Sequence, residues 1–342
     1  MFVRNNVPLN AFSTMRLGGV AAHLVEVTDR SQAQEAVEWA QSRSLPFIVI
    51  GEGSNIIWRD EGFPGLVVVN KIKHFELYEH DAETTYVTAG GGENWDEVVE
   101  RTVNNGLSGI ETLSLIPGTA GATPVQNVGA YGSEISDVLM AIEAYDVTQG
   151  QLVTIRGSEC EFAYRTSKFK TTEKNRYIIT AITLRLTKSP MRPPFYASLQ
   201  KYLSENNVTD YSPQSIRQAV IAIRSEKLPD PKLHANNGSF FQNPIVSQDF
   251  VNNLTDMYPD MTYWRLDSGQ VKLSAAWLVE RAGFKNVHDN ETGMRTWEKQ
   301  PLVLVNEHAK STQDLLNFKQ KIVNAVHEKF GIELRQEPEL LP

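Results

Sequence analysis

The chain has 342 residues, of which 41% are hydrophobic and 22% are charged; this is an ordinary globular composition in a chain too long for a single core. The formal net charge of -8 argues against a nucleic-acid or anionic-membrane partner, because both attract basic surfaces. Cys160 is the only cysteine, which excludes an intrachain disulfide and a cysteine-rich metal site.

The first residues and the apolar stretches of the chain indicate where the protein is expected in the cell. The opening MFVRNNVPLNAF lacks the apolar run of a signal peptide, and no apolar run has the length of a membrane span. We therefore expect a cytoplasmic protein without membrane insertion. The histidines lack metal-ligand spacing, so we expect no metal site. In the absence of a long apolar heptad repeat, we expect a monomer.

The predicted elements alternate in the first half of the chain. We expect a helix over 31–44, with Ser31 and Gln34 as its capping box, and strands over 45–50, 66–70 and 84–89. A second helix over 93–105 follows, and strands dominate from 135 to 186. The proline-rich stretch 189–194 predicts a linker or mobile loop.

The last third reads as helix, strand and helix after a helix over 213–226. Ser274 is predicted to cap one helix, 301–306 to form a buried strand, and Ser311 to cap a long helix ending at Gly331. This pattern predicts a small α+β domain, distinct from the glycine-rich half.

The segment Ile116–Gly132, IPGTAGATPVQNVGAYG, is rich in glycine and carries no charge. Glycine lets a backbone approach a ligand closely, and successive N–H groups in such turns can hold anions. We interpret the segment as a cradle for a pyrophosphate and its attached rings; the alternative is a solvated loop.

A second polar turn, GEGSN at residues 51–55, follows a predicted strand. It fails the dinucleotide fingerprint because Ile56 stands where the third glycine is needed, so a nucleotide-binding Rossmann unit is disfavoured. Alone, it could be a plain turn that ends a strand. Together with Ile116–Gly132 it favours a large diphosphate ligand such as FAD.

Three further features carry candidate chemistry. The stretch NNGSFFQNP (236–244) sets Ser239 beside two phenylalanines, after a basic, proline-fixed KLPDPK. Without an activating histidine nearby, Ser239 is doubtful as an acyl-transfer nucleophile and could be a turn residue. Arg165 could form a surface ion pair, and the terminal EPE (337–339) could be a solvated tail.

The ordered set of motifs resembles one family. GEGSN, the glycine-rich segment, FAYRTSKFK, KLPDPK, NNGSFFQNP, VKLSAAWLVERAG and EPE occur in the order found in UDP-N-acetylenolpyruvoylglucosamine reductases, the MurB flavoenzymes of peptidoglycan synthesis. The resemblance runs from about Val7 to Glu339. It implies a role in cell-wall biogenesis, and with it in cell shape, cell cycle and cell division.

The resemblance implies an α+β fold: an FAD-binding fold of the vanillyl-alcohol-oxidase (PCMH) type in two subdomains, plus a C-terminal α+β substrate-binding domain. The implied division is 1–70, 71–212 with a mobile loop near 189–200, and 213–330, with the tail 331–342 returning to the active site. The loop tyrosine, Tyr196, resembles that of the family's first subtype, which closes over the UDP-sugar.

The implied reaction has two halves, with non-covalent FAD as cofactor and NADPH as co-substrate. Hydride passes from NADPH to the flavin N5 and then to C3 of the enolpyruvyl ether, and C2 is protonated to give UDP-N-acetylmuramate. The resemblance makes Ser239 the acid for C2, and makes Arg165 and Glu339 the groups that stabilise the enediolate-like charge. Glu339 could donate there only with a pKa raised by burial.

The resemblance also assigns binding residues. The implied cofactor-binding residues are Gly51, Glu52, Gly53, Ser54, Asn55, Ile116, Pro117, Gly118, Gly121, Ala122, Thr123, Gln126, Asn127, Gly129 and Tyr131. The implied substrate-binding residues are Tyr196, Lys227, Asn243, Tyr263, Lys272 and Gln300.

Two departures from the family pattern and two rival functions stay open. Ala122 stands where a serine is common, so Thr123 could supply the phosphate hydrogen bond instead. The approach to EPE is longer than usual, which leaves Glu337 as an alternative to Glu339. The rivals are an alcohol or sugar oxidase of the same fold and a non-catalytic binding protein. Covalent flavinylation is disfavoured because neither glycine-rich motif contains His or Cys.

Overall fold

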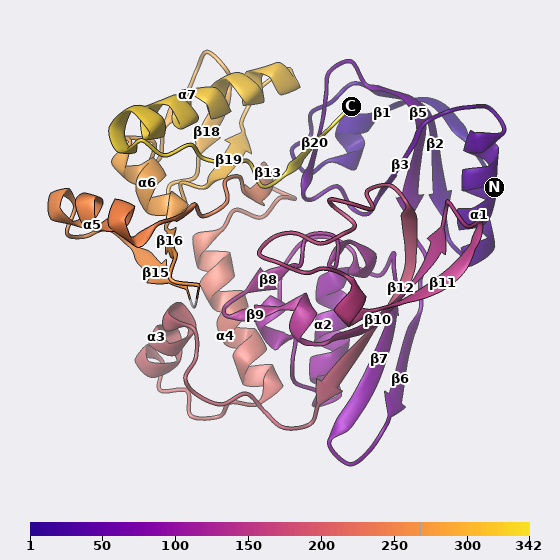
Figure 1. Ribbon diagram of the computed structural model, residues 1–342, viewed down its shortest axis with the longest axis horizontal. Helices are drawn as coiled ribbons and strands as arrows, with labels where there is room; N and C mark the ends of the chain where they lie inside the picture. Colours follow the sequence, from indigo (N-terminus) through magenta and orange to yellow (C-terminus); the bar gives the residue numbers. More distant parts are fainter. Residues whose placement is uncertain (267) are drawn as a thin grey trace. The chain divides into compact units, whose positions relative to one another are not determined.

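The computed structural model describes residues 1–266 and 268–342 (Figure 1). By the contacts among their backbones, these residues separate into two compact units. The first contains residues 1–7, 21–52 and 63–226, and the second contains residues 8–20, 53–62 and 227–342. Two short N-terminal stretches therefore fold with the C-terminal third. The boundaries after residues 70, 212 and 330 stay predictions.

The first unit begins with a four-stranded sheet of order β1-β2-β5-β3. Its strands and the helix on it are β1 (Arg4–Pro8), β2 (Val20–Val27), α1 (Arg30–Gln41), β3 (Phe47–Ile50) and β5 (Phe63–Asn70). The neighbours β2, β5 and β3 run parallel, and β5 is buried along most of its length, as parallel strands usually are. The apolar stripe of α1 packs on this sheet through Ala33, Ala36, Val37 and Ala40.

The second sheet of this unit is antiparallel, with order β11-β10-β12-β7-β6. Its strands are β6 (Phe75–Glu79), β7 (Thr84–Gly90), β10 (Leu139–Asp146), β11 (Gln151–Arg156) and β12 (Tyr177–Thr187), and Figure 1 shows β7 and β12 side by side. Helix α2 (Trp95–Asn104) packs on it, burying Trp95, Val98 and Val99 with Val87 and Ile182. This core positions the segment that follows α2.

The remaining elements of the first unit are short or peripheral. They are η2 (Glu111–Leu113), η3 (Ala120–Ala122), β8 (Gly129–Ala130), β9 (Ser133–Glu134), η4 (Ile135–Asp137), η5 (Gly157–Glu159), α3 (Ala197–Glu205) and α4 (Pro213–Lys227). Helices α3 and α4 share an apolar cluster that contains Phe195, Leu199 and Ile216. The stretch 189–194 forms neither helix nor strand, as its prolines predicted.

The second unit combines two small sheets, of order β13-β19-β18-β17 and β14-β16-β15, with a parallel pair, β20-β4. Its elements are η1 (Leu9–Phe12), β4 (Ile56–Trp58), β13 (Ala235–Ser239), β14 (Ile245–Val246), α5 (Gln248–Met257), β15 (Tyr263–Arg265), β16 (Val271–Leu273), α6 (Ala275–Arg281), β17 (His288–Asp289), β18 (Met294–Thr296), β19 (Val303–Asn306), α7 (Thr312–Phe330) and β20 (Glu339–Leu341). Phe240, Phe241 and Phe318 are buried in its core.

The observed helix caps can be compared directly with those predicted from the sequence. Ser274 and Ser311 accept hydrogen bonds from the first turns of α6 and α7, and Gly331 ends α7 in the left-handed conformation, as predicted. The capping box at Ser31 was wrong, because the N-cap of α1 is Asp29, whose carboxylate accepts from Gln32 N at 2.9 Å. Helices α3 and α5 were not predicted.

None of the helices in residues 1–266 and 268–342 is both long and apolar enough to cross a membrane.

Candidate active site

The glycine-rich segment of the first unit is held by its own backbone and by the loop before α2. The N–H groups of Ala120 and Gly121 donate to the carbonyls of Glu93 and Gly91, each at 2.9 Å. Those of Ala122 and Thr123 donate within the segment itself, at 3.0 and 3.1 Å. These four N–H groups already have acceptors, so an anion bound here would rely on other donors.

Glycine is required where this segment meets its neighbours. A Cβ on Gly121 would lie 2.9 Å from the Cα of Gly91, and one on Gly51 would lie 2.4 Å from Oγ1 of Thr119. Both distances are shorter than side chains tolerate, so Gly51 packs its backbone on the Thr119 side chain, and Gly121 packs its backbone on that of Gly91. The structure thus brings the start of GEGSN against Ile116–Gly132.

Arg165 lies against the same segment, although it is distant in sequence. Its Nη2 donates to the carbonyl of Gly129 at 2.6 Å and its Nη1 to that of Asn127 at 3.4 Å. The carboxylate of Glu134 is 4.0 Å from Nη1. Arg165 itself is left-handed, with φ of 56°. The guanidinium is thereby fixed in direction, which suits a group that must meet developing negative charge.

Two predicted cofactor-binding side chains have structural partners. The amide of Asn127 donates to Glu134 at 2.6 Å and to the carbonyl of Ala163 at 3.3 Å. The hydroxyl of Thr123 donates to the carbonyl of Ala120 at 2.7 Å. Because that hydroxyl proton is committed, Thr123 is poorly placed to replace the serine that Ala122 lacks.

Tyr131 joins the end of the segment to two other elements. Its ring packs edge-on against Tyr196, with ring centroids 6.0 Å apart, and its side chain lies beside Arg224 of α4 and interacts with it electrostatically. Burial raises the pKa of Tyr131 above its usual value, and Arg224 opposes this shift. Burial also lowers the pKa of the Arg224 guanidinium. Sequence reasoning missed Arg224, because nothing local links it to Tyr131.

In the second unit, Asn237 ties NNGSFFQNP to GEGSN. Its Nδ2 donates to Oγ1 of Thr14 at 3.1 Å and to the carbonyls of Ser54 and Ile56, both at 3.2 Å. The following residue, Gly238, has φ of 69°, a conformation that favours glycine, and it turns the chain into Ser239. The motif was recognised in the sequence, but this role of Asn237 was not.

The C-terminal residues 337–339 hydrogen-bond to both NNGSFFQNP and GEGSN. The N–H of Glu337 donates to the carbonyl of Phe240 at 2.8 Å, and the N–H of Glu339 donates to the carbonyl of Asn55 at 3.0 Å. Glu339 then pairs with Ile56 as β20 and β4 run parallel. EPE is therefore ordered and leads into β20, so the alternative of a solvated tail was wrong.

The predicted substrate-binding residues of this unit lie on several elements. Oδ1 of Asn243 accepts from the N–H of Ala275 at 2.9 Å, so its amide also supports the start of α6. Lys272 of β16 lies over the ring of Trp264, 5.6 Å from its centroid, and Tyr263 pairs with Leu273. Gln300 is buried, at 8% exposed.

The other predicted residues are placed as follows. Oε1 of Glu52 accepts from Nδ2 of Asn94 at 3.0 Å, the carbonyl of Gly53 accepts from Thr14 N at 3.1 Å, and the carbonyl of Gly118 accepts from Trp95 N at 2.9 Å. Lys227 is the last residue of α4. Ile116 and Gln126 are half-buried, whereas Pro117 and Ala122 are exposed.

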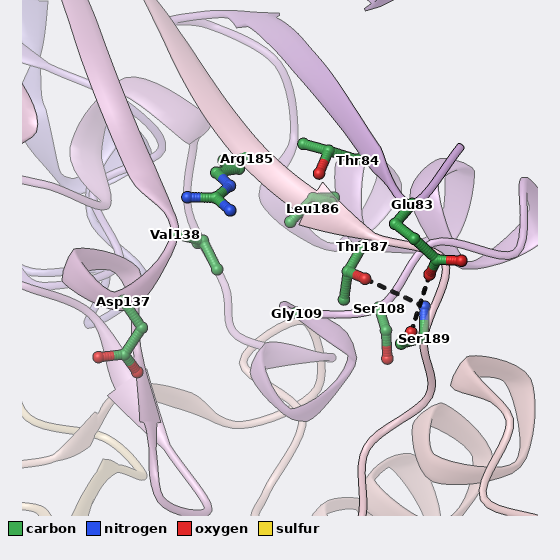
Figure 2. A pocket seen from close by; sticks show the side chains of 10 residues that line it. All are labelled: Glu83, Thr84, Ser108, Gly109, Asp137, Val138, Arg185, Leu186, Thr187 and Ser189. Carbon is green, nitrogen blue, oxygen red and sulfur yellow. Dashed lines mark hydrogen bonds between the residues drawn. The ribbon is translucent and has the colours of Figure 1, made fainter. Parts of the chain in front are cut away.

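A separate hollow of about 420 Å³ lies in the first unit, at the ends of β7 and β12 (Figure 2). It contains none of the predicted site residues. Ser189 donates there to Oε2 of Glu83 at 2.9 Å and to Oγ1 of Thr187 at 3.1 Å, so much of its polar lining is paired internally. We assign it no role in the site.

Two known protein families match separate parts of the chain. Residues 21–156 match the FAD binding domain family, and residues 230–341 match the C-terminal domain of UDP-N-acetylenolpyruvoylglucosamine reductase. The UDP-N-acetylenolpyruvoylglucosamine reductase of Alcanivorax borkumensis is 39% identical over 338 residues, 99% of this chain and 96% of that protein. The enzyme of the same name from Dechloromonas aromatica is 40% identical over 97% of this chain and 98% of its own.

The chain belongs to the UDP-N-acetylenolpyruvoylglucosamine reductase family. It is thus an oxidoreductase with an FAD-binding domain, and the resemblance seen in the motifs is confirmed. A membership in this family places it in peptidoglycan synthesis.

Solved structures confirm the fold class. The UDP-N-acetylenolpyruvylglucosamine reductase (MurB) of Thermus caldophilus covers 100% of both chains with a TM-score of 0.68 and 24% identity. 6-Hydroxy-D-nicotine oxidase from Arthrobacter nicotinovorans covers 97% of this chain and 86% of its own, with a TM-score of 0.54 and 11% identity. The protein has a PCMH-type FAD-binding fold joined to the family's C-terminal α+β domain.

The residues present fit an FAD cofactor. Nε of Arg224, beside Tyr131, is buried and has no hydrogen-bond partner among the described residues. Oδ1 of Asn237, beside Ser54, is buried in the same way within the second unit. Unpaired buried polar atoms are rare in folded proteins, and ligands commonly satisfy them. Within the first unit, the unpaired Nε of Arg224 and the close backbone approaches at Gly51 and Gly121 are what a polar, ring-bearing ligand requires.

Proposed function

We propose that the protein reduces the enolpyruvyl ether of UDP-N-acetylenolpyruvoylglucosamine to UDP-N-acetylmuramate, with NADPH as the reductant. The observation that carries this proposal is Arg165, whose guanidinium is fixed on the carbonyls of Asn127 and Gly129 in the predicted flavin segment. Relatives that this chain matches over 96–98% of their length bear the name of this reductase.

FAD would be held non-covalently by the residues around GEGSN and Ile116–Tyr131, and would supply there the hydride chemistry that links NADPH to C3 of the enol ether. The chain's own residues then handle charge and protons. Hydride addition at C3 moves negative charge from C2 onto the substrate carboxylate. Arg165 would pair with that carboxylate, since a fixed guanidinium stabilises charge that develops during the reaction.

Ser239 would give its proton to C2. A hydroxyl is a weak acid, but a carbanion-like centre is a strong base, so the transfer is favourable. Its place on β13, directly after the left-handed Gly238, gives the hydroxyl a rigid support. Lys227, Asn243, Tyr263, Lys272 and Gln300 would bind the UDP-sugar, and the buried Oε1 of Gln300 lacks a partner among the described residues.

Glu339 would stabilise the intermediate together with Arg165. Glu337 is the second candidate, because its N–H donates to the carbonyl of Phe240, the residue after Ser239. Glu337→Gln and Glu339→Gln separate them: the active-site carboxylate is the one whose loss slows reoxidation of the flavin by substrate and leaves bleaching by NADPH intact. Equal, small effects from both would remove the tail carboxylates from the mechanism.

Tyr196 would close over the substrate, as in the family's first subtype. Its edge-on packing against Tyr131 gives it a position beside the predicted cofactor residues. Tyr196→Phe keeps that ring contact and removes the hydroxyl. We expect a higher KM for the UDP-sugar with little change in the KM for NADPH; an unchanged KM for the sugar would exclude the hydroxyl from binding.

An anaerobic experiment tests the reaction as a whole. The purified protein should be yellow and should release free FAD on denaturation. NADPH should bleach it, and UDP-N-acetylenolpyruvoylglucosamine should restore the colour without oxygen. Ser239→Ala should bleach normally and recover slowly. A colourless protein that does not take up FAD, or a bleached one that recovers only in oxygen, contradicts the proposal; the latter would indicate an oxidase.

A further inference from the structure

Leu115, directly before the glycine-rich segment, has an unusual backbone conformation. Its φ is 58°, in the left-handed region that a side chain with a Cβ disfavours. Its side chain is 38% exposed, so packing of the side chain does not compensate well. Something else in the surrounding structure must hold this residue in place.

The N–H of Leu115 is held from α2. It donates to Oδ1 of Asp96 at 2.5 Å. Asp96 is in turn bound by both guanidinium nitrogens of Arg217, with Nη1–Oδ1 at 2.6 Å and Nη2–Oδ2 at 3.0 Å. Arg217 is only 8% exposed. This forked pair fixes the direction of the carboxylate, and therefore the point at which the N–H of Leu115 must lie.

The carbonyl of Leu115 is held from α4. It accepts from Nη2 of Arg224 at 3.3 Å, and Arg224 also interacts electrostatically with Tyr131 near the other end of the segment. Arg217 and Arg224 are seven residues apart on α4, which is about two turns, so they lie on one face. One face of α4 therefore interacts with Leu115, directly before the segment, and with Tyr131, near its end.

We propose that Asp96 and Arg217 are positioning residues for FAD: by holding Leu115 in the left-handed conformation, they set the path of Ile116–Tyr131. The inference rests on the proposed cofactor. It assigns the pair no contact with flavin or substrate. A path set wrongly at Leu115 would displace the backbone of the segment that is expected to surround the cofactor, so the first property to change is retention of FAD.

The chain contains a matched pair for comparison. Asp146 and Arg176 also form a forked pair in the first unit, with Nη2–Oδ2 at 2.7 Å; Asp146 is buried and Arg176 half-buried, but they hold the turn after β10. Removing only one member of either pair leaves a buried charge and could unfold the protein. The test therefore uses Asp96→Ala with Arg217→Met and, as control, Asp146→Ala with Arg176→Met.

The measured quantity is the rate at which FAD leaves the purified holoprotein after dilution, followed by flavin fluorescence, alongside the thermal midpoint. We expect the Asp96/Arg217 double variant to release FAD faster on the order of tenfold, the size of the penalty for a non-glycine left-handed residue. The control double variant should release it within about twofold of the wild type, even where its thermal midpoint falls as far.

A third substitution distinguishes a positioning role of Asp96 and Arg217 from a merely structural one. Glycine adopts the left-handed conformation without a Cβ penalty. Adding Leu115→Gly to the Asp96/Arg217 double variant should bring FAD release back to within about threefold of the wild type. Equal FAD loss in the two double variants, or no rescue by Leu115→Gly, would overturn the positioning role. A wild-type protein without FAD would overturn the proposed function itself.

Discussion

The C-terminal strand offers a sharp test of how EPE is held. Leu341, at the end of β20, is 5% exposed and lies opposite Trp58 of β4. Core leucine-to-alanine changes cost about 2–5 kcal/mol, and a strand near the chain end relaxes into the space left, so we take ~2 kcal/mol for Leu341→Ala. That corresponds to roughly a 30-fold shift in the equilibrium between paired and frayed strand.

Hydrogen exchange reads this equilibrium at two amides. The N–H of Arg59 donates to the carbonyl of Leu341, and the N–H of Glu339 donates to that of Asn55, both at 3.0 Å. In Leu341→Ala, both amides should exchange about 30-fold faster where local opening governs exchange. If Glu339 acts in the reaction as proposed, reoxidation by the UDP-sugar should also slow, while bleaching by NADPH is unchanged.

Leu334→Ala is the control, because Leu334 is also 5% exposed but lies upstream of EPE, in the main core of the second unit. It should lower the thermal midpoint without accelerating those two amides selectively. The reasoning is refuted if Leu341→Ala and Leu334→Ala give the same exchange at Arg59 and Glu339.

Three further predictions concern the first unit. Gly121→Ala places a Cβ 2.9 Å from the Cα of Gly91, which should cost about 1–3 kcal/mol in denaturant unfolding and weaken FAD binding; wild-type binding would contradict the close approach. Burial raises the pKa of Cys160 to about 11, so the native thiol should resist alkylation at pH 8 and react only after unfolding. The stability contributed by the buried, protonated Cys160 thiol is full below about pH 8.5 and is lost as pH rises through 11. In Cys160→Ala, the thermal midpoint should therefore fall less between about pH 8.5 and pH 11 than in the wild type. Burial would raise the pKa of Asp96, but the hydrogen bonds from Arg217 and from a backbone N–H outweigh it and leave the pKa below its usual value. The stability this gives is present above about pH 4 and lost as pH falls through the lowered pKa, so the Asp96/Arg217 double variant should lose less stability than the wild type between pH 4 and pH 2; parallel curves would contradict this.

Local patterns in the sequence predicted much of the secondary structure and the family. The apolar stripe of α1, the serine caps of α6 and α7, and the glycine at the end of α7 depend on residues a few positions apart, so each could be read without a fold. The ordered motifs likewise identified the family and its FAD-binding domain. The error at Ser31 arose because two neighbouring residues, Asp29 and Ser31, both suit an N-cap, and periodicity does not choose between them.

Tertiary structure alone decided which distant residues meet. Asn237 contacts Thr14 across 223 positions, and Arg217 contacts Asp96 across 121, and no local pattern announces either partner. The stretch 53–62 belongs to the C-terminal unit, where β4 pairs with β20, and the stretch 8–20 belongs to it through Met15 and Leu17, which are buried in its core. The physical reason is general: helix periods and caps are local energies, whereas strand partners, buried ion pairs and backbone approaches at glycine depend on the packing of the whole chain.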